Sequence, residues 1–121
     1  LVINRERQLT RVQVHGRVTA DELIGAIRSY YDGEPTDHVL WDVRDADLTL
    51  LHAADVKSIE METLQYADKR GTGRTAIVAR DDLGFGLGRM FDTYQELDAS
   101  PRSHRTFKTI EEAYKWLFQD R

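Results

Sequence analysis

The residues with the clearest potential for chemistry lie in a glycine-rich stretch in the second half of the chain. Gly84, Gly86 and Gly88 follow a short apolar run that is typical of a buried strand. A helix that begins at such a bend presents free backbone amides and a positive dipole end, and both attract anions. Arg89 could assist a bound phosphate or carboxylate. The candidate ligand-binding residues of this stretch are Gly84, Phe85, Gly86, Gly88 and Arg89.

The same glycines have a second interpretation, in which they bind nothing. Their G-x-G-x-G spacing differs from the dinucleotide-binding G-x-G-x-x-G pattern, and no P-loop lysine follows. Glycines would then let the helix begin close to its neighbours, while Phe85 and Leu87 fill the core. The sequence leaves both interpretations open: a site for an anionic or small molecule, or close packing.

Aspartates form a second group with chemical potential. Asp45, Asp47 and Thr49 spell D-x-D-x-T, the nucleophile motif of haloacid-dehalogenase-type phosphatases. In a parallel sheet this segment would lie at the carboxyl end of one strand and near the carboxyl end of the next, where open α/β sheets usually bind ligands. The candidate ligand-binding carboxylates at these two strand ends are Asp42, Asp45, Asp81 and Asp82.

An enzymatic role for these aspartates is a remote alternative. Clustered carboxylates can hold Mg²⁺, but a phosphatase of this type needs a longer chain, a strand that ends on the first aspartate, and a supporting lysine. None of these is evident in the sequence. A polar loop rich in aspartate is most often a solvated turn. We therefore predict no catalytic residue, no metal site and no cofactor, and we do not expect an enzyme.

Histidine and cysteine add no catalytic set. The histidines lack the spacing of metal ligands, and no G-x-S-x-G nucleophile elbow is present to pair with one of them. The absence of cysteine excludes disulfides, thiolate metal sites and cysteine nucleophiles. A cytoplasmic location is the natural expectation for such a chain. The histidines are His15, His38, His52 and His104.

The elements that must position these residues follow from apolar periodicity and capping signals. Apolar runs and period-two alternation predict strands, and apolar residues at helical spacing predict amphipathic helices. Capping boxes at Thr19 with Glu22 and at Thr109 with Glu112 mark the starts of the first and last helices. The glycine stretch leads into a helix from Leu87 onward. The predicted strands are 1–3, 9–15, 39–43, 75–79 and 102–107, and the second helix is 53–69.

This order predicts a single α/β domain over residues 1–121. It reads strand, strand, helix, strand, helix, strand, helix, strand, helix, which favours a mixed, mainly parallel sheet of about five strands with helices on its faces. We expect a polar loop at 44–49, and we expect the polar 102–107 strand at the sheet edge.

Composition and charge limit the kinds of partner that this chain could bind. The 121-residue chain carries a net charge of −4, so it lacks the basic field that nucleic-acid phosphates require. Its longest apolar runs are far shorter than the roughly 20 residues that a membrane helix needs. We expect neither nucleic-acid binding nor a membrane span.

Four segments together resemble one known family. They are VHGRVTADEL (14–23), VLWDVRDAD (39–47), GRTAIVARDDLGFGLGRMF (73–91) and RTFKTIEEAYKWL (105–117). This pattern resembles the SpoIIAA-like group of the STAS domains, the fold of sulphate-transporter and anti-sigma-factor-antagonist domains. The resemblance implies a compact α/β domain of bacterial type, with an antiparallel N-terminal strand beside parallel ones. Relatives range from phospho-regulated interaction modules to proteins compared with lipid-binding domains.

One departure from that family removes its switch. Antagonist STAS proteins carry a phosphorylatable serine at the start of the second long helix, but residues 50–56 read LLHAADV. Thr49 precedes this segment and Ser58 lies inside the helix. The sequence therefore predicts no phosphorylation site and no kinase partner.

Two functions follow as hypotheses. The first is a non-catalytic interaction module that binds a protein partner or itself as a homodimer. Trp116 and Phe118 cannot face the same way on one helix, so one of them is expected to be exposed and available to a partner. The alternative is a binding domain for a small molecule, an anion or a lipid headgroup, with its pocket between the loops at Asp42–Asp47 and Asp81–Gly88.

Overall fold

The computed structural model describes residues 2–4, 8–33, 35–66, 73–98 and 103–119. Strands and helices alternate through most of the chain, in the predicted order. The elements are β1 (Val2–Asn4), β2 (Leu9–Arg17), α1 (Ala20–Asp32), β3 (His38–Asp47), α2 (Ala53–Leu64), β4 (Arg74–Val78), α4 (Asp82–Leu97), β5 (Ser103–Phe107) and α5 (Ile110–Leu117).

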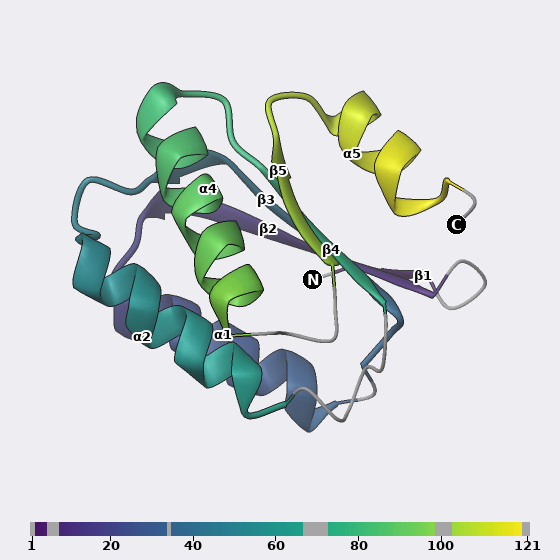
Figure 1. The fold of residues 1–121 in the computed structure, drawn as a ribbon, viewed down its shortest axis with the longest axis horizontal. Helices are drawn as coiled ribbons and strands as arrows, with labels where there is room; N and C mark the ends of the chain where they lie inside the picture. Colours follow the sequence, from purple (N-terminus) through teal and green to yellow (C-terminus); the bar gives the residue numbers. More distant parts are fainter. Residues whose placement is uncertain (1, 5–7, 34, 67–72, 99–102, 120–121) are drawn as a thin grey trace.

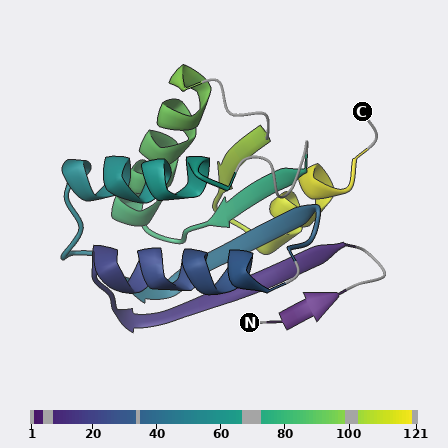
Figure 2. The same ribbon diagram turned by 90° about the horizontal axis from the view of Figure 1, so that it is seen from below.

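The sheet has the strand order β1-β2-β3-β4-β5. β2 to β5 are parallel to one another, and the three-residue β1 pairs antiparallel with β2. Helices α1, α2 and α4 cover one face of the sheet and α5 covers the other (Figures 1 and 2). The predicted mixed, mainly parallel α/β sheet is confirmed. The parallel sheet itself has four strands, and about five is reached only by adding the short β1.

The predicted capping residues Thr19 and Thr109 cap their helices, with the reciprocal bonds of a full capping box at α1 and a side-chain cap at α5. At the start of α1, the Glu22 amide donates to Thr19 Oγ1 at 3.2 Å, and the Thr19 amide donates to Glu22 Oε1 at 3.0 Å. At the start of α5, the Glu112 amide donates to Thr109 Oγ1 at 3.3 Å. These bonds satisfy amides that have no partner within the helix, so the starts of both helices could be located from the sequence.

The third strand is longer than predicted. Instead of a polar loop at 44–49, β3 continues to Asp47, because its outer half pairs with residues His15 to Arg17 of β2 beyond an irregularity in register. Asp47 Oδ1 then accepts bonds from the Thr49 amide at 3.0 Å and the Thr49 hydroxyl at 2.6 Å. Asp47 and Thr49, the last two members of the D-x-D-x-T motif, thus close the turn after β3.

Helix α4 begins five positions earlier than predicted, at Asp82 and not at Leu87. Asp81 caps it, since the Gly84 amide donates to Asp81 Oδ1 at 2.8 Å. The three alternating glycines therefore lie inside the helix and do not form a bend before it. Helix α2 ends at Leu64, so the predicted helix over 65–66 is wrong, and the remainder of the predicted extension, 67–69, lies outside the described residues.

The prediction that either Trp116 or Phe118 is exposed is wrong, because both are half-buried. The Trp116 ring lies 5.6 Å from that of Phe107, and the Arg74 guanidinium lies 5.4 Å from the Trp116 ring centroid. Phe118 turns to the other side, where its ring meets His38 at 5.6 Å. The edge strand and the start of β3 thus give each aromatic ring its own packing partner.

Candidate functional site: an apolar cavity between the sheet and three helices

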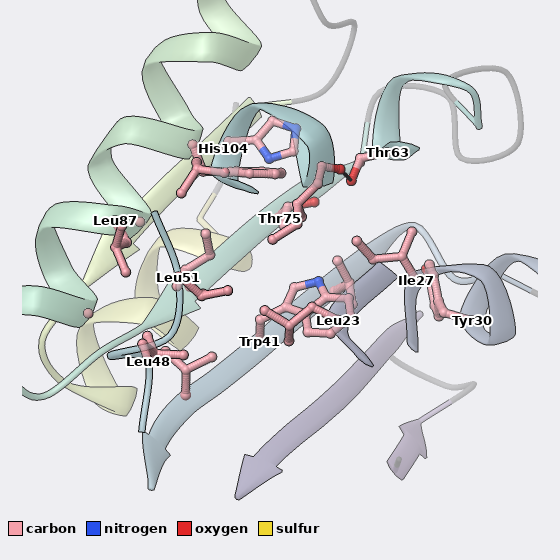
Figure 3. Close-up of a pocket in the computed structure, with 18 of the residues that line it drawn as sticks. Leu23, Ile27, Tyr30, Trp41, Leu48, Leu51, Thr63, Thr75, Leu87 and His104 are labelled. Carbon is pink, nitrogen blue, oxygen red and sulfur yellow. Dashed lines mark hydrogen bonds between the residues drawn. The ribbon is translucent and has the colours of Figure 1, made fainter. Parts of the chain in front are cut away.

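A cavity of about 120 Å³ lies between the sheet and the helices α1, α2 and α4. Its walls are almost entirely apolar, and they include aromatic rings from the sheet and from two helices (Figure 3). The lining residues are Leu23, Ile27, Tyr30, Tyr31, Val39, Trp41, Val43, Leu48, Leu51, Val56, Ile59, Thr63, Thr75, Ile77, Gly84, Leu87, Gly88, Phe91 and His104.

The two faces of the sheet are filled to different extents. Towards α5, Leu40 and Ala76 in the central strands are 0% exposed. Towards the three helices, Trp41 and Ile77 in the same two strands stay partly exposed, although helices cover them. Side chains in a native interior normally fill such space. The remaining exposure of Trp41 and Ile77 therefore marks space that the described side chains leave unfilled.

The packing of α4 explains where this space arises. The backbone of α4 makes close contacts with β5, whereas the backbone of α2 makes its main close contacts with α1 and α4. A Cβ added to Gly88 would lie only 2.6 Å from Thr106 Oγ1, so the absence of a side chain lets α4 settle onto the edge strand. The helical layer therefore packs closely on the sheet at β5. The cavity lies between the helices and the neighbouring strands β3 and β4.

Tyrosine rings form the wall at the α1 end. Tyr30 and Tyr31 meet edge to face at 4.7 Å, and Tyr31 stacks on Tyr66 at 4.5 Å. The Tyr30 hydroxyl donates to the Thr36 carbonyl oxygen at 3.0 Å and accepts from the Thr36 amide at 3.1 Å. These bonds fix the ring of Tyr30, and they direct its hydroxyl to the segment that enters β3.

The polar side chains of the lining gather at one end. Thr75 and His104 are partners in the register between β4 and β5, and Thr63 lies in the last turn of α2. Figure 3 shows Thr63, Thr75 and His104 near one another, away from Leu48. The His104 ring also contacts Phe91 edge-on at 5.4 Å. The cavity is therefore apolar for most of its length and polar at the amino end of the parallel strands.

Buried polar groups join the two helices above the cavity. Glu60 of α2 is 0% exposed, and its Oε2 accepts from Gln95 Nε2 of α4 at 3.1 Å. Lys57 Nζ donates to Glu60 Oε1 at 3.1 Å and to Asp98 Oδ2 at 2.8 Å. Burial raises the pKa of the Glu60 carboxyl, against the opposing effect of Lys57. This cluster holds α2 against α4 and fixes the roof of the cavity.

Asp92 of α4 is a second buried carboxyl near this region. Thr106 Oγ1 of β5 donates to Asp92 Oδ2 at 2.8 Å, while Asp92 Oδ1 has no hydrogen-bond partner among the described residues. Burial raises the pKa of Asp92 to about 6. The neighbouring Thr106 hydroxyl and the Arg89 charge lower the pKa only in part.

The structure disperses the predicted glycine-rich site. Gly84 and Gly88 line the cavity, but Gly86 faces open space and Arg89 is exposed. The Phe85 ring lies outside the cavity lining, with Lys108 Nζ at 5.2 Å from its centroid. The N-terminus of α4 is already capped by the Asp81 carboxylate. Two of the five residues thus help to shape an apolar space, and the group as a whole does not converge on an anion.

The predicted aspartates Asp42, Asp81 and Asp82 each have a different partner. Asp42 is 1% exposed and lies on the α5 face of the sheet, opposite the cavity, because it alternates with Trp41 along β3. It accepts bonds from Arg44 Nη2 at 2.8 Å and Arg11 Nη2 at 3.2 Å. These bonds lower the pKa of Asp42 to about 2. The carboxylate is therefore an internal counter-ion for two arginines.

The remaining predicted carboxylates belong to surface elements. Asp45 lies in the outer part of β3, Asp81 caps α4, and Asp82 is exposed, with Lys108 Nζ at 3.8 Å. In the part of the chain that the structure describes, no three histidine or acidic side chains are grouped to hold a metal ion. The predicted pocket between the two loops is not assembled by these residues. The cavity lies on one face of the sheet, and Asp42 lies on the other.

Comparison with family models, curated proteins and solved structures found no match for this chain. None of the helices, within the described residues, is long and apolar enough to cross a membrane.

Sequence reasoning assigned most of the cavity lining to the core and did not find the cavity. Ile27 and Ile59 fall on the predicted helix stripes, and Trp41 lies in a predicted central strand. Such patterns identify side chains that turn inward, but they do not reveal whether opposing side chains meet.

Proposed function

We propose that this domain is a non-catalytic binding domain for a small, largely apolar molecule, which it holds between the sheet and the helices α1, α2 and α4. The observation that carries the proposal is the unfilled apolar space above Trp41 and Ile77. Binding pockets for small molecules are typically concave and lined by apolar and aromatic side chains, with a few polar groups that orient the ligand. This function is the small-molecule alternative of the sequence analysis, with its site between the sheet and the helices instead of between the loops at Asp42–Asp47 and Asp81–Gly88.

The size of the cavity indicates the size of the ligand. An engineered apolar cavity of about 150 Å³ in another protein stays dry and binds benzene. The 120 Å³ cavity is close to that volume. A molecule of about one aromatic ring therefore fits without movement of the helices, and a longer molecule would extend towards the partly exposed lining.

The expected gain on binding is measurable. Empty apolar space costs about 24 cal/mol per Å³ in core-truncation variants. A ligand that fills the 120 Å³ space would give its apolar walls the contacts that they lack. Because a ligand that binds only the folded state raises its apparent stability, this gain should appear as a higher melting temperature.

The test is to add toluene or 4-methylphenol at millimolar concentration and to record thermal unfolding and tryptophan fluorescence. Trp41 lines the cavity and Trp116 lies on the opposite face of the sheet, so Trp116→Phe leaves a reporter that views the cavity alone. We expect a rise of a few degrees in melting temperature and a change in Trp41 emission. No change in either signal would contradict the proposal.

A cavity-filling variant provides the control. Ile77→Phe adds volume inside the cavity, and strands accommodate aromatic residues well. We expect it to weaken binding of toluene at least tenfold while the protein stays folded. Leu97→Phe, at a position that is 74% exposed at the end of α4, makes the same type of change outside the cavity and should bind toluene normally.

A further inference from the structure

The distribution of polar atoms around the cavity specifies the chemistry of the ligand beyond its size. Resting on the proposed function, we propose that the preferred ligand is an uncharged ring that carries one hydroxyl group, with the ring among the leucines and the hydroxyl at the Thr63, Thr75 and His104 end. A phenol is the simplest member of this class. The inference depends on the ordering of the lining along the cavity and on the charges buried in its roof.

The two ends of the cavity differ because they lie at opposite ends of the parallel strands. Leu48 follows the carboxyl end of β3, and Leu51 precedes α2. Thr75 lies at the amino end of β4, and Thr63 lies in the last turn of α2. From Val56 to Thr63 the lining runs along about 10 Å of α2, given a rise of about 1.5 Å per residue. A ring with a single polar substituent spans a comparable distance.

The polar end suits a hydroxyl group. Thr63 Oγ1 donates to the Ile59 carbonyl oxygen at 3.0 Å, so towards a ligand it offers an acceptor. A threonine hydroxyl can accept a further hydrogen bond while it donates one, and a histidine ring has two nitrogen atoms that can bond. Thr63 and Thr75 are both buried, so a ligand group that reaches them leaves water. A ligand hydroxyl can match either role of a neighbouring hydroxyl, whereas a bare hydrocarbon ring makes no polar contact there.

The roof of the cavity disfavours an ionised carboxylate. Glu60 of α2 and Asp92 of α4 are both buried carboxyls, and Glu60 directly follows Ile59 of the lining. A ligand anion would place a further carboxylate in this poorly solvated region, where Lys57 is already bonded to Glu60 and Asp98. Burying a charge without a partner costs far more than burying a hydrogen-bonded neutral group. The lining itself offers hydroxyl and imidazole groups, which suit a neutral ligand.

Four rings of matched shape test the proposal: toluene, 4-methylphenol, 4-methylbenzoate and 4-methylbenzylamine, each titrated at neutral pH into the Trp116→Phe protein. One hydrogen bond corresponds to roughly three- to tenfold in affinity, so we expect 4-methylphenol to bind tighter than toluene by about that factor. The benzoate and the benzylamine should bind at least tenfold more weakly than 4-methylphenol. Tightest binding by either charged ring, or equal binding of 4-methylphenol and toluene, would overturn the inference.

Threonine variants locate the hydroxyl. Thr63→Val and Thr75→Val keep the shape of each side chain and remove its hydroxyl, so each should lower the ratio of 4-methylphenol to toluene affinity towards one. Thr10→Val is the matched control, because Thr10 is also buried but bonds to Thr36 outside the lining. An unchanged ratio in both cavity variants would also overturn the inference. If toluene and all three other rings fail to bind, the proposed function itself fails, which is a distinct result.

Discussion

Asp92 and Asp42 are both buried carboxyls, yet their surroundings shift the pKa in opposite directions. Arg44 and Arg11 lower the pKa of Asp42 to about 2, whereas burial raises the pKa of Asp92 to about 6. Relative to an exposed aspartate, folding thus stabilises the ionised form of Asp42 and disfavours the ionised form of Asp92. At the scale of single residues, the partner of a carboxyl and not its burial alone decides how it contributes to stability.

Replacing Asp92 tests this difference. The folded-state pKa of about 6 lies above the ordinary value of 3.8. Stability from protonated Asp92 is therefore fully present below pH 3.8 and is lost as the pH rises through 6. We expect Asp92→Asn, which stays neutral and can still accept from Thr106, to raise the free energy of unfolding at pH 8 by about 1–2 kcal/mol. Urea unfolding at several pH values measures this.

Measurements at low pH and on an Asp42 variant provide the controls. At pH 4 the two proteins should have nearly equal stability, because Asp92 is then protonated. Asp42→Asn should behave oppositely: it should cost about 2 kcal/mol at pH 7, since it removes the charge that pairs with Arg11 and Arg44. If Asp92→Asn were less stable than wild type at pH 8, the ionised Asp92 carboxylate would be stabilised by its partners in the folded state, and the expectation would be wrong.

At the scale of elements, α4 depends on its contact with β5. Glycine is a poor helix former, yet three glycines lie in the first half of this helix. Gly88 lies against Thr106, where no Cβ fits, and Gly86 faces open space. The same residue type therefore has a packing role at one position and none at the other.

Alanine substitutions at these two glycines should have opposite effects. Gly88→Ala forces α4 away from β5 or displaces Thr106, so we expect a loss of about 1–3 kcal/mol in the free energy of unfolding. Gly86→Ala meets no atom within 4 Å and improves helix propensity, so a gain of about 0.5–1 kcal/mol is expected. Chemical unfolding of both variants measures the difference. Stabilisation by Gly88→Ala would exclude the close approach described above.

At the scale of the whole molecule, the sheet separates two interiors of different quality. The α5 side is closely filled, with Leu40, Ala76 and Leu117 buried together. The other side carries three helices and an unfilled space. A three-layer arrangement permits this contrast, because each face of a sheet packs independently of the other. The closely filled face can maintain the fold, and the space that we propose to bind a ligand lies on the opposite face.

Self-association stays a prediction of the sequence, and its original basis is weaker, because Trp116 packs inside the protein. Met61 of α2 and Leu97 of α4 are exposed instead, at 56% and 74%. We expect light scattering at micromolar concentration to give the mass of a dimer. Met61→Glu combined with Leu97→Glu should restore the monomer if the outer surfaces of these helices form the contact. A wild-type chain that is strictly monomeric would contradict the prediction.

The sequence by itself determined the order of strands and helices, the mixed α/β class and the helix starts at Thr19 and Thr109. These features depend on residues close together in the chain: a hydroxyl three positions from a carboxylate, or apolar residues at a fixed period. The edge position of β5 was also accessible, because its sequence is polar.

Only the tertiary structure decided how the candidate residues are used. The register between β2 and β3 extends β3 to Asp47, and strand alternation places Asp42 on the face opposite the cavity. Contact with Thr106 assigns Gly88 to packing. The cavity itself depends on whether side chains from distant segments meet in the space between them. No local sequence pattern specifies the gap between these side chains, because the gap depends on how closely whole helices approach the sheet.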